Sequence, residues 1–176
     1  MNEHTITDVD AVRRAGSRAE QYRELLRALT GLLDGERDGL ANMANFAALV
    51  YSGLPELNWA GFYLWRDGQL VLGPFQGRPA CVRIDAGRGV CGAAVVRRAS
   101  VRVDDVHAFP GHIACDAASR SELVVPFFSG ATLLGVFDLD SPRTARFDAV
   151  DEQGIHSALQ VLTAATRLSW PAWPAP

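Results

Sequence analysis

The residue types most suited to chemistry gather in one polar, turn-rich stretch, DVHAFPGHIACDAASRSELVVP (105–126). It lies between two apolar runs that read as strands, and its residues 108–120 show no hydrophobic period, so we expect a long loop there. Long loops in compact domains are usually functional or disordered. Cys115 lies on this loop, and Glu122 follows it at the start of the next predicted strand. A thiol and a carboxylate in this arrangement make the stretch a candidate reactive centre.

The three cysteines, Cys81, Cys91 and Cys115, all fall where a strand or a helix meets a loop. Each could be a small buried apolar residue, which is the commonest fate of a free cysteine. Together they could carry thiol redox chemistry, with an attacking, a resolving and a relay thiol. A zinc site of Cys115 with His107 and His112, which Cys81 and Cys91 could join, is the third interpretation, but no C-x-x-C pair or standard ligand spacing supports it. The nearby acids favour redox chemistry, and we expect no bound metal.

Three carboxyl groups supply the other half of the candidate chemistry. In the predicted strand TLLGVFDLD (132–140), alternation places Asp138 and Asp140 on one face and Phe137 on the other. Glu122, on an adjacent predicted strand, would share the face of the two aspartates. Carboxyl groups this close cannot all ionise, so at least one pKa should rise and a proton should be held near neutrality. Such a group can protonate a substrate oxygen.

Gly87, Gly89 and Gly92 spell G-x-G-x-x-G between a predicted strand and a short helix. This is the outline of a dinucleotide-binding fingerprint, but no alternating strand–helix series surrounds it. The pattern favours a tight loop whose helix N-terminus offers N–H groups to an anionic part of a ligand. Cys91 lies in the first turn of that helix, where the helix dipole would favour a thiolate.

The predicted strand NWAGFYLW (58–65) is apolar or aromatic on both faces. Trp59 and Tyr63 share one face, and Phe62 and Leu64 share the other. The strand could be a central one that simply fills the core on both sides. Alternatively, Phe62 and Leu64 meet the helices while Trp59 and Tyr63 line a ligand pocket.

The order of predicted elements indicates one α+β domain, a largely antiparallel sheet flanked by helices. Helices are predicted over 20–35, over 40–54 and from Asp148 onward, and strands over 58–65, 69–75, 80–84, 101–106, 122–128 and 132–140. We place a loose N-terminal arm at 1–17, the folded domain at 18–169 and a disordered Trp- and Pro-rich tail at 170–176.

Composition excludes several classes of protein. The net charge of -3 and the absence of a basic block argue against a nucleic-acid partner. No apolar run is long enough to span a membrane, and the N-terminus does not resemble a signal peptide. An odd number of cysteines argues against a secreted disulfide framework, so we expect a cytoplasmic protein. The apolar stripe of the first predicted helix permits a homodimer.

Five segments together resemble the free methionine-(R)-sulfoxide reductase family, which are small GAF-domain enzymes. They are NWAGFYL (58–64), LVLGPFQGRPACVRI (70–84), GRGVCG (87–92), DVHAFPGHIACDAASRSELVVP (105–126) and LLGVFDLDSP (133–142). The likeness runs from Asn58 to the end of the last predicted helix. It implies a six-stranded antiparallel GAF sheet with helices on one face and a loop-covered ligand pocket on the other.

The resemblance also implies a role for each cysteine. Cys115 would attack the sulfoxide sulfur and become a sulfenic acid, and Cys81 would resolve it as an intramolecular disulfide. Cys91 would be an alternative or relay thiol. Thioredoxin or another dithiol would then reduce the enzyme, with no bound cofactor.

The implied substrate is free methionine-(R)-sulfoxide. Glu122, Asp138 and Asp140 would bind its sulfoxide end and polarise or protonate the oxygen, and Trp59 and Tyr63 would enclose the S-methyl group. A non-catalytic GAF domain that senses a small molecule is the alternative function. Such a sensor has no need of this set of cysteines and carboxylates.

Overall fold

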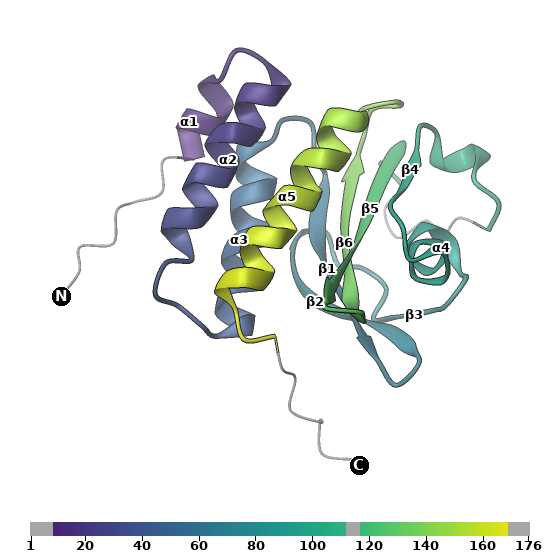
Figure 1. Ribbon diagram of the computed structural model, residues 1–176. Coiled ribbons are helices and arrows are strands. Elements are labelled where there is room, and N and C mark those ends of the chain that lie inside the picture. The colour runs from purple at the N-terminus through teal and green to yellow at the C-terminus, as the bar shows by residue number, and fades with distance from the viewer. Residues whose placement is uncertain (1–8, 112–116, 169–176) are drawn as a thin grey trace.

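A six-stranded antiparallel sheet runs through the middle of the protein in the order β3-β2-β1-β6-β5-β4 (Figure 1). The strands are β1 (Trp59–Arg66), β2 (Gln69–Gly77), β3 (Arg83–Asp85), β4 (Val101–Val103), β5 (Ser121–Ser129) and β6 (Thr132–Ser141). This computed structural model describes residues 9–111 and 117–168. The two central strands, β1 and β6, pair antiparallel over six consecutive positions. The strand that carries both aspartates is therefore buried in the centre of the sheet.

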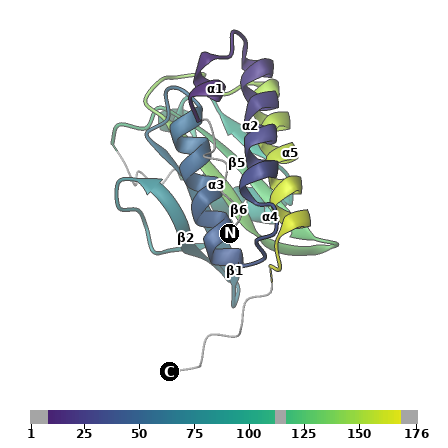
Figure 2. The ribbon, with the colours of Figure 1, turned by 90° about the vertical axis from the view of Figure 1, so that its left-hand side faces the viewer.

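The helices form two unequal layers. They are α1 (Val9–Arg14), α2 (Arg18–Leu32), α3 (Gly39–Gly53), α4 (Gly89–Arg97) and α5 (Ala149–Ala165), with a short 3₁₀ helix, η1 (Val106–Ala108). Helices α2, α3 and α5 lie side by side over one face of the sheet, whereas α4 lies on the opposite side (Figures 1 and 2). The face next to α4 is therefore covered by fewer helices than the opposite face. A binding site can open on it.

Capping side chains fix where the long helices begin. Ser17 and Asp148 each form a capping box, with Glu20 and Asp151 as the partners that reach back to the cap. Asp38 accepts a hydrogen bond from the N–H of Ala41 at the start of α3. Such caps satisfy helix N–H groups that have no partner within the helix, which stabilises these starts.

The two faces of the central strands pack into separate cores. Phe62 of β1 and Phe137 of β6 meet Phe46 of α3, with ring centroids 5.3 Å and 4.9 Å from that of Phe46. Trp59 and Tyr63 belong to the other core, which includes residues of α4. Strand β1 is therefore buried on both faces, and its aromatic residues divide between the helices and the opposite side as the second interpretation predicts.

A buried charged cluster ties the helices to the end of the sheet. Asp151 is fully buried, and its carboxylate lies 3.0 Å from the guanidinium of Arg146, which is 4% exposed. The hydroxyl of Tyr22 and the guanidinium of Arg18, both on α2, also donate to Asp151, at 2.9 Å and 2.8 Å. Because a buried charge is tolerated only when it is paired and hydrogen-bonded, this cluster fixes α2 against α5.

The main differences from the sequence-based elements lie near the N-terminus and at two short strands. Residues 9–14, predicted as part of a loose arm, form helix α1, and the fully buried Val12 packs into the core. The strand predicted over 101–106 ends at Val103, because Asp105 caps η1 by accepting from the N–H of His107. The strand predicted over 80–84 begins only at Arg83. Residues 1–8 and the predicted tail 170–176 lie outside the described residues.

The apolar stripe of α2 packs inside the chain. Tyr22, Leu25 and Leu29 are buried in the core shared with α3 and α5. This stripe therefore supplies no surface for a partner, and a homodimer stays a prediction without that support. Among the described residues, no helix combines the length and the apolar character that a membrane span requires.

Gly154 of α5 is expected to tolerate no side chain. A Cβ there would lie 2.2 Å from the ring of Tyr22, which cannot retreat because its hydroxyl is bonded to Asp151. We expect Gly154→Ala to lower the free energy of unfolding by about 1–3 kcal/mol, as overpacking does. The matched control is Gly31→Ala on α2, where no atom lies within 4 Å of the added Cβ. That change should leave stability unchanged or raise it by up to about 1 kcal/mol. Equal losses in the two variants, measured by urea unfolding, would contradict the packing argument.

Candidate functional site

A pocket opens on the face of the sheet that carries α4. The described residues that line it include Trp59, Tyr63, Cys91, Glu122, Asp138 and Asp140. All six were selected from the sequence. The structure thus brings an aromatic wall, a thiol and three carboxyl groups together, from β1, α4, β5 and β6.

The strand register places the three carboxyl groups on one face. Glu122 of β5 pairs directly with Asp140 of β6, and Val124 pairs with Asp138. Side chains alternate along a strand, so Asp138 and Asp140 point to the same side as Glu122. Glu122 is 6% exposed and Asp138 is 7% exposed. The pocket therefore holds two nearly buried carboxyl groups and a half-buried third.

Burial raises the pKa of Glu122 and the pKa of Asp138 well above their ordinary values. The neighbouring charge of Asp140 raises both pKa values further, since a second negative charge nearby disfavours ionisation. A hydrogen bond between the two side chains raises the pKa of Glu122 and lowers that of Asp138. Both pKa values are therefore raised, which is the direction that the sequence analysis predicts for this cluster.

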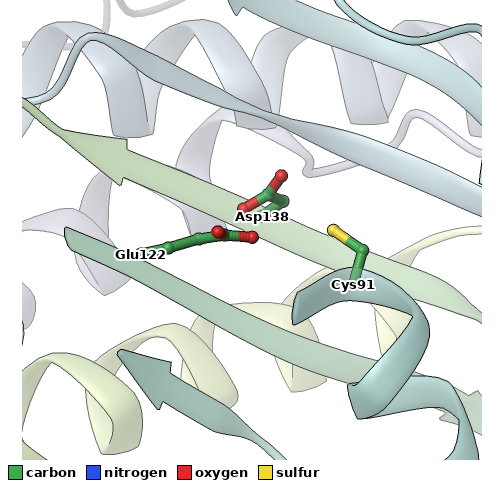
Figure 3. Close-up of side chains that lie close together, drawn as sticks. All are labelled: Cys91, Glu122 and Asp138. Atoms are coloured by element: carbon green, nitrogen blue, oxygen red, sulfur yellow. The ribbon is translucent and has the colours of Figure 1, made fainter. Parts of the chain in front are cut away.

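Cys91 lies at the start of α4 with its sulfur directed toward Glu122 and Asp138 (Figure 3). Burial raises the pKa of its thiol well above the ordinary value, and the negative charges of Asp138 and Glu122 raise it further. The thiol also hydrogen bonds to Asp138. The expectation that the helix dipole favours a thiolate here is therefore wrong. A dipole contributes about 0.3–1 kcal/mol at an exposed helix end, which does not offset burial beside two carboxyl groups.

Trp59 and Tyr63 form a rigid wall of the pocket. Trp59 stacks on Tyr63 and on Phe75, with ring centroids 5.8 Å and 5.4 Å apart. The indole N–H of Trp59 donates to the carbonyl of Arg78, and the hydroxyl of Tyr63 donates to the carbonyl of Cys81 at 3.0 Å. These bonds fix both rings and connect them to the segment that carries Cys81.

The glycine-rich turn builds the start of α4 against the end of β3. Gly87 and Gly89 have φ values of 80° and 61°, which favour glycine. A Cβ on Gly92 would lie 2.5 Å from the carbonyl oxygen of Asp85, so only glycine allows this close approach. Arg88, at the cap position, forms no side-chain capping bond. Residues of the first turn of α4 line the pocket, and N–H groups at a helix start suit an anion. The antiparallel sheet rules out a parallel strand–helix–strand nucleotide fold here.

The comparisons with known proteins identify the family. Residues 41–165 match the GAF domain family model. The chain is 54% identical to protein YtsP of Bacillus subtilis, over 80% of this chain and 88% of that protein. It is 51% identical to the free methionine-R-sulfoxide reductase of Escherichia coli, over 83% of this chain and 88% of that enzyme. The chain belongs to the free methionine-(R)-sulfoxide reductase family of GAF domains.

The same likeness holds in three dimensions. The free methionine-R-sulfoxide reductase of Neisseria meningitidis, solved in complex with its substrate, superposes with a TM-score of 0.83 at 43% identity. The match covers 86% of this chain and 91% of that one. The fold expected from the family resemblance, a single α+β GAF domain with a six-stranded antiparallel sheet, is therefore confirmed.

Four residues that the family resemblance or the zinc interpretation selects are not among the described residues that line the pocket. Cys115 and His112 lie outside the described residues. Cys81 is half-buried beside the pocket, where Tyr63 donates to its carbonyl. His107 is exposed on η1.

The sequence analysis missed Ser119 and Arg78, which also line the pocket. Ser119 is 3% exposed, and its hydroxyl accepts a hydrogen bond from the side chain of Asn58. The only signal for Ser119 is its place just before a predicted strand that carries Glu122. Arg78 follows directly after the end of β2, and no local sequence pattern predicts where that strand ends.

Glu122→Gln is expected to change how stability depends on pH. The folded state keeps the Glu122 proton above the ordinary pKa of 4.5, where the unfolded state has lost it. Wild-type stability should therefore fall as pH rises from that value through the raised pKa. Gln removes this loss, so the melting temperature of Glu122→Gln minus that of wild type should increase as the pH rises above 4.5. The control is Glu24→Gln on α2, which removes a carboxyl group outside the pocket. A difference for Glu122→Gln that does not change with pH would contradict a shared buried proton.

The two cysteines within the described residues should differ in reactivity. Cys91 is buried and its pKa is raised, whereas Cys81 is half-buried. Because the thiolate is the reactive form, iodoacetamide should modify Cys81 well before Cys91 in the reduced native protein at neutral pH. Peptide mass mapping over time measures both rates, and urea-unfolded protein is the control in which they should become equal. Faster modification of Cys91 in the native state would show that its thiol is neither buried nor protonated.

Proposed function

We propose that this protein reduces free methionine-(R)-sulfoxide to methionine, with a thiol as the electron donor. The observation that carries the proposal is the hydrogen-bonded Glu122–Asp138 pair, whose burial raises both pKa values, in a pocket with an aromatic wall and a thiol. Relatives that share 51% and 38% identity with this chain bear the name free methionine-R-sulfoxide reductase. The family and the chemistry of the pocket therefore support the same reaction.

In this proposal the carboxyl groups activate the sulfoxide. A sulfoxide is a poor electrophile until its oxygen is protonated or strongly hydrogen-bonded. Glu122 holds a proton in a nearly dry site, beside Asp138 and Asp140, and can donate it to the sulfoxide oxygen. The flat faces of Trp59 and Tyr63 enclose the S-methyl group.

We assign the nucleophile to Cys115. Its sulfur attacks the activated sulfoxide, the oxygen passes to the cysteine as a sulfenic acid, and methionine leaves as the thioether. The Cys81 thiol then attacks the sulfenic acid, which forms a disulfide and releases water. The two cysteine sulfurs supply the two electrons, and thioredoxin or another dithiol restores them.

Cys91 is the weaker candidate for the resolving step. Its thiol is buried and its pKa is raised, so little thiolate is present to attack a sulfenic acid. Cys81 is more accessible to a reductant. A relay through Cys91 would require movement of α4 away from the carboxyl groups.

The amino-acid end of the substrate has a complementary site. The first-turn N–H groups of Gly89 and Val90, with the guanidinium of Arg88 at the rim, suit the α-carboxylate. A free amino acid carries this carboxylate, whereas a methionine within a protein chain does not. A reductant such as thioredoxin is met in the cytoplasm, where we place the enzyme.

Turnover assays test the proposal directly. Wild-type protein with dithiothreitol should release methionine from the free (R)-sulfoxide and none from the (S)-sulfoxide. Cys115→Ser should abolish turnover. Glu122→Gln should lower it by about 10²–10⁴-fold, the usual contribution of a general acid. The control Glu24→Gln should match wild type.

A non-catalytic sensor would give a different result. Well-folded wild-type protein would then turn over neither epimer, although it could still bind a small molecule. Full activity of Cys115→Ser would contradict the assigned nucleophile while leaving the reaction itself in place.

A further inference from the structure

We infer that the reduced pocket also binds a zinc-like divalent cation through Cys91, Glu122 and Asp138, and that this ion excludes the sulfoxide. Binding of the ion is inferred from the geometry of the pocket alone. Exclusion of the sulfoxide by the ion rests on the proposed function. The ion would be a reversible ligand of the site rather than a resident cofactor.

The three side chains already converge from three elements. One ligand atom each from Cys91 of α4, Glu122 of β5 and Asp138 of β6 lies within 4.8 Å of the others (Figure 3). Zinc bonds are about 2.3 Å to sulfur and about 2.0–2.2 Å to oxygen, so small side-chain rotations would bring all three into contact with one ion.

A second observation points to a missing positive partner. Oδ1 of Asp138 is buried and has no hydrogen-bond partner within the described residues. Asp138 is 7% exposed and lines the pocket. Buried polar atoms are almost always paired, and an unpaired carboxylate oxygen in a pocket is suited to a cation. The carboxyl group of Asp138 also accepts hydrogen bonds from the side chains of Cys91 and Glu122 and from the backbone N–H of Leu139.

The ligand types select the kind of ion. Magnesium and calcium prefer oxygen ligands only, whereas a thiolate with two carboxylates favours zinc and similar metals. Binding would displace the thiol proton of Cys91 and the shared carboxyl proton into solvent. Three protein ligands leave a fourth position for water. The cavity volume of about 40 Å³ allows it, since one water needs roughly 10–15 Å³.

The consequence for turnover follows from the shared residues. The same carboxyl groups that would protonate the sulfoxide would be ligands of the ion, so the two cannot occupy the pocket together. Zinc should therefore act as a reversible inhibitor that competes with the sulfoxide. A chelator should restore full activity.

Cobalt(II) provides a test that needs no turnover. Wild-type protein, reduced with a phosphine under nitrogen and titrated with Co²⁺, should develop the near-ultraviolet charge-transfer band of a thiolate–cobalt bond. Zn²⁺ should displace it. Cys91→Ser should lose the band, whereas Cys81→Ser and Cys115→Ser should keep it. A band that survives in Cys91→Ser, or that is lost in Cys115→Ser alone, would overturn the inference.

Two further variants decide the result if Cys91→Ser does not fold. Glu122→Gln and Asp138→Asn retain every thiol, and each should weaken Co²⁺ binding by about tenfold or more, as loss of a metal-site partner does. Unchanged Co²⁺ affinity in both variants would overturn the assigned ligands.

The exclusion of substrate is measured separately. In Cys115→Ser, which should bind the sulfoxide without consuming it, added free methionine-(R)-sulfoxide should lower the apparent Co²⁺ affinity. An affinity that does not change would overturn competition while leaving the metal site in place. Failure of wild-type turnover would count against the proposed function and would not alter the Co²⁺ result.

Discussion

The pocket depends on the interaction between two carboxyl groups, those of Glu122 and Asp138, which lie close together inside the sheet. Glu122 and Asp138 lie on adjacent strands and are nearly buried, so two ionised carboxylates there would repel each other across a medium that screens them poorly. The raised pKa values of both groups favour a proton shared between them, which replaces this repulsion with a hydrogen bond. The thiol of Cys91, protonated for the same reason, completes the arrangement. The chemistry and the stability of this face therefore depend on the same proton.

The opposite face of the sheet supplies the stability that this arrangement requires. Phe46, Phe62 and Phe137 pack together there, with Phe46 and Phe137 edge to face, and the Arg146–Asp151 cluster fixes the helices over them. Acids inside a central strand break the usual hydrophobic pattern, and such local violations are typical of functional sites. Side chains alternate along a strand, so the same strand can pack one face into the hydrophobic core and line the pocket with the other. Stability and chemistry therefore lie on opposite faces of the sheet.

The features that the sequence predicted best are those that depend on the alternation of side chains along a strand. The period of β6 placed Asp138 and Asp140 together, and the neighbouring strand brought Glu122 beside them. The protonation of Cys91 could not be predicted, since it depends on burial against residues far away in the chain. Helix α1 was missed because six residues carry too little periodicity to separate a helix from an arm. The link between Tyr63 and Cys81 is likewise a tertiary contact without a local signal.

The central pairing of β1 with β6 has a consequence for how the protein is made. These strands come from opposite halves of the chain, whereas β1–β2 and β5–β6 are joined by short turns. Closing a long loop costs chain entropy before the stabilising contacts form. Strands that are far apart in the sequence therefore pair slowly during folding. The aromatic wall is on β1 and the aspartates are on β6. The pocket is therefore assembled by the least local contact in the sheet, and a nascent or half-folded chain has thiols but no site in which to use them.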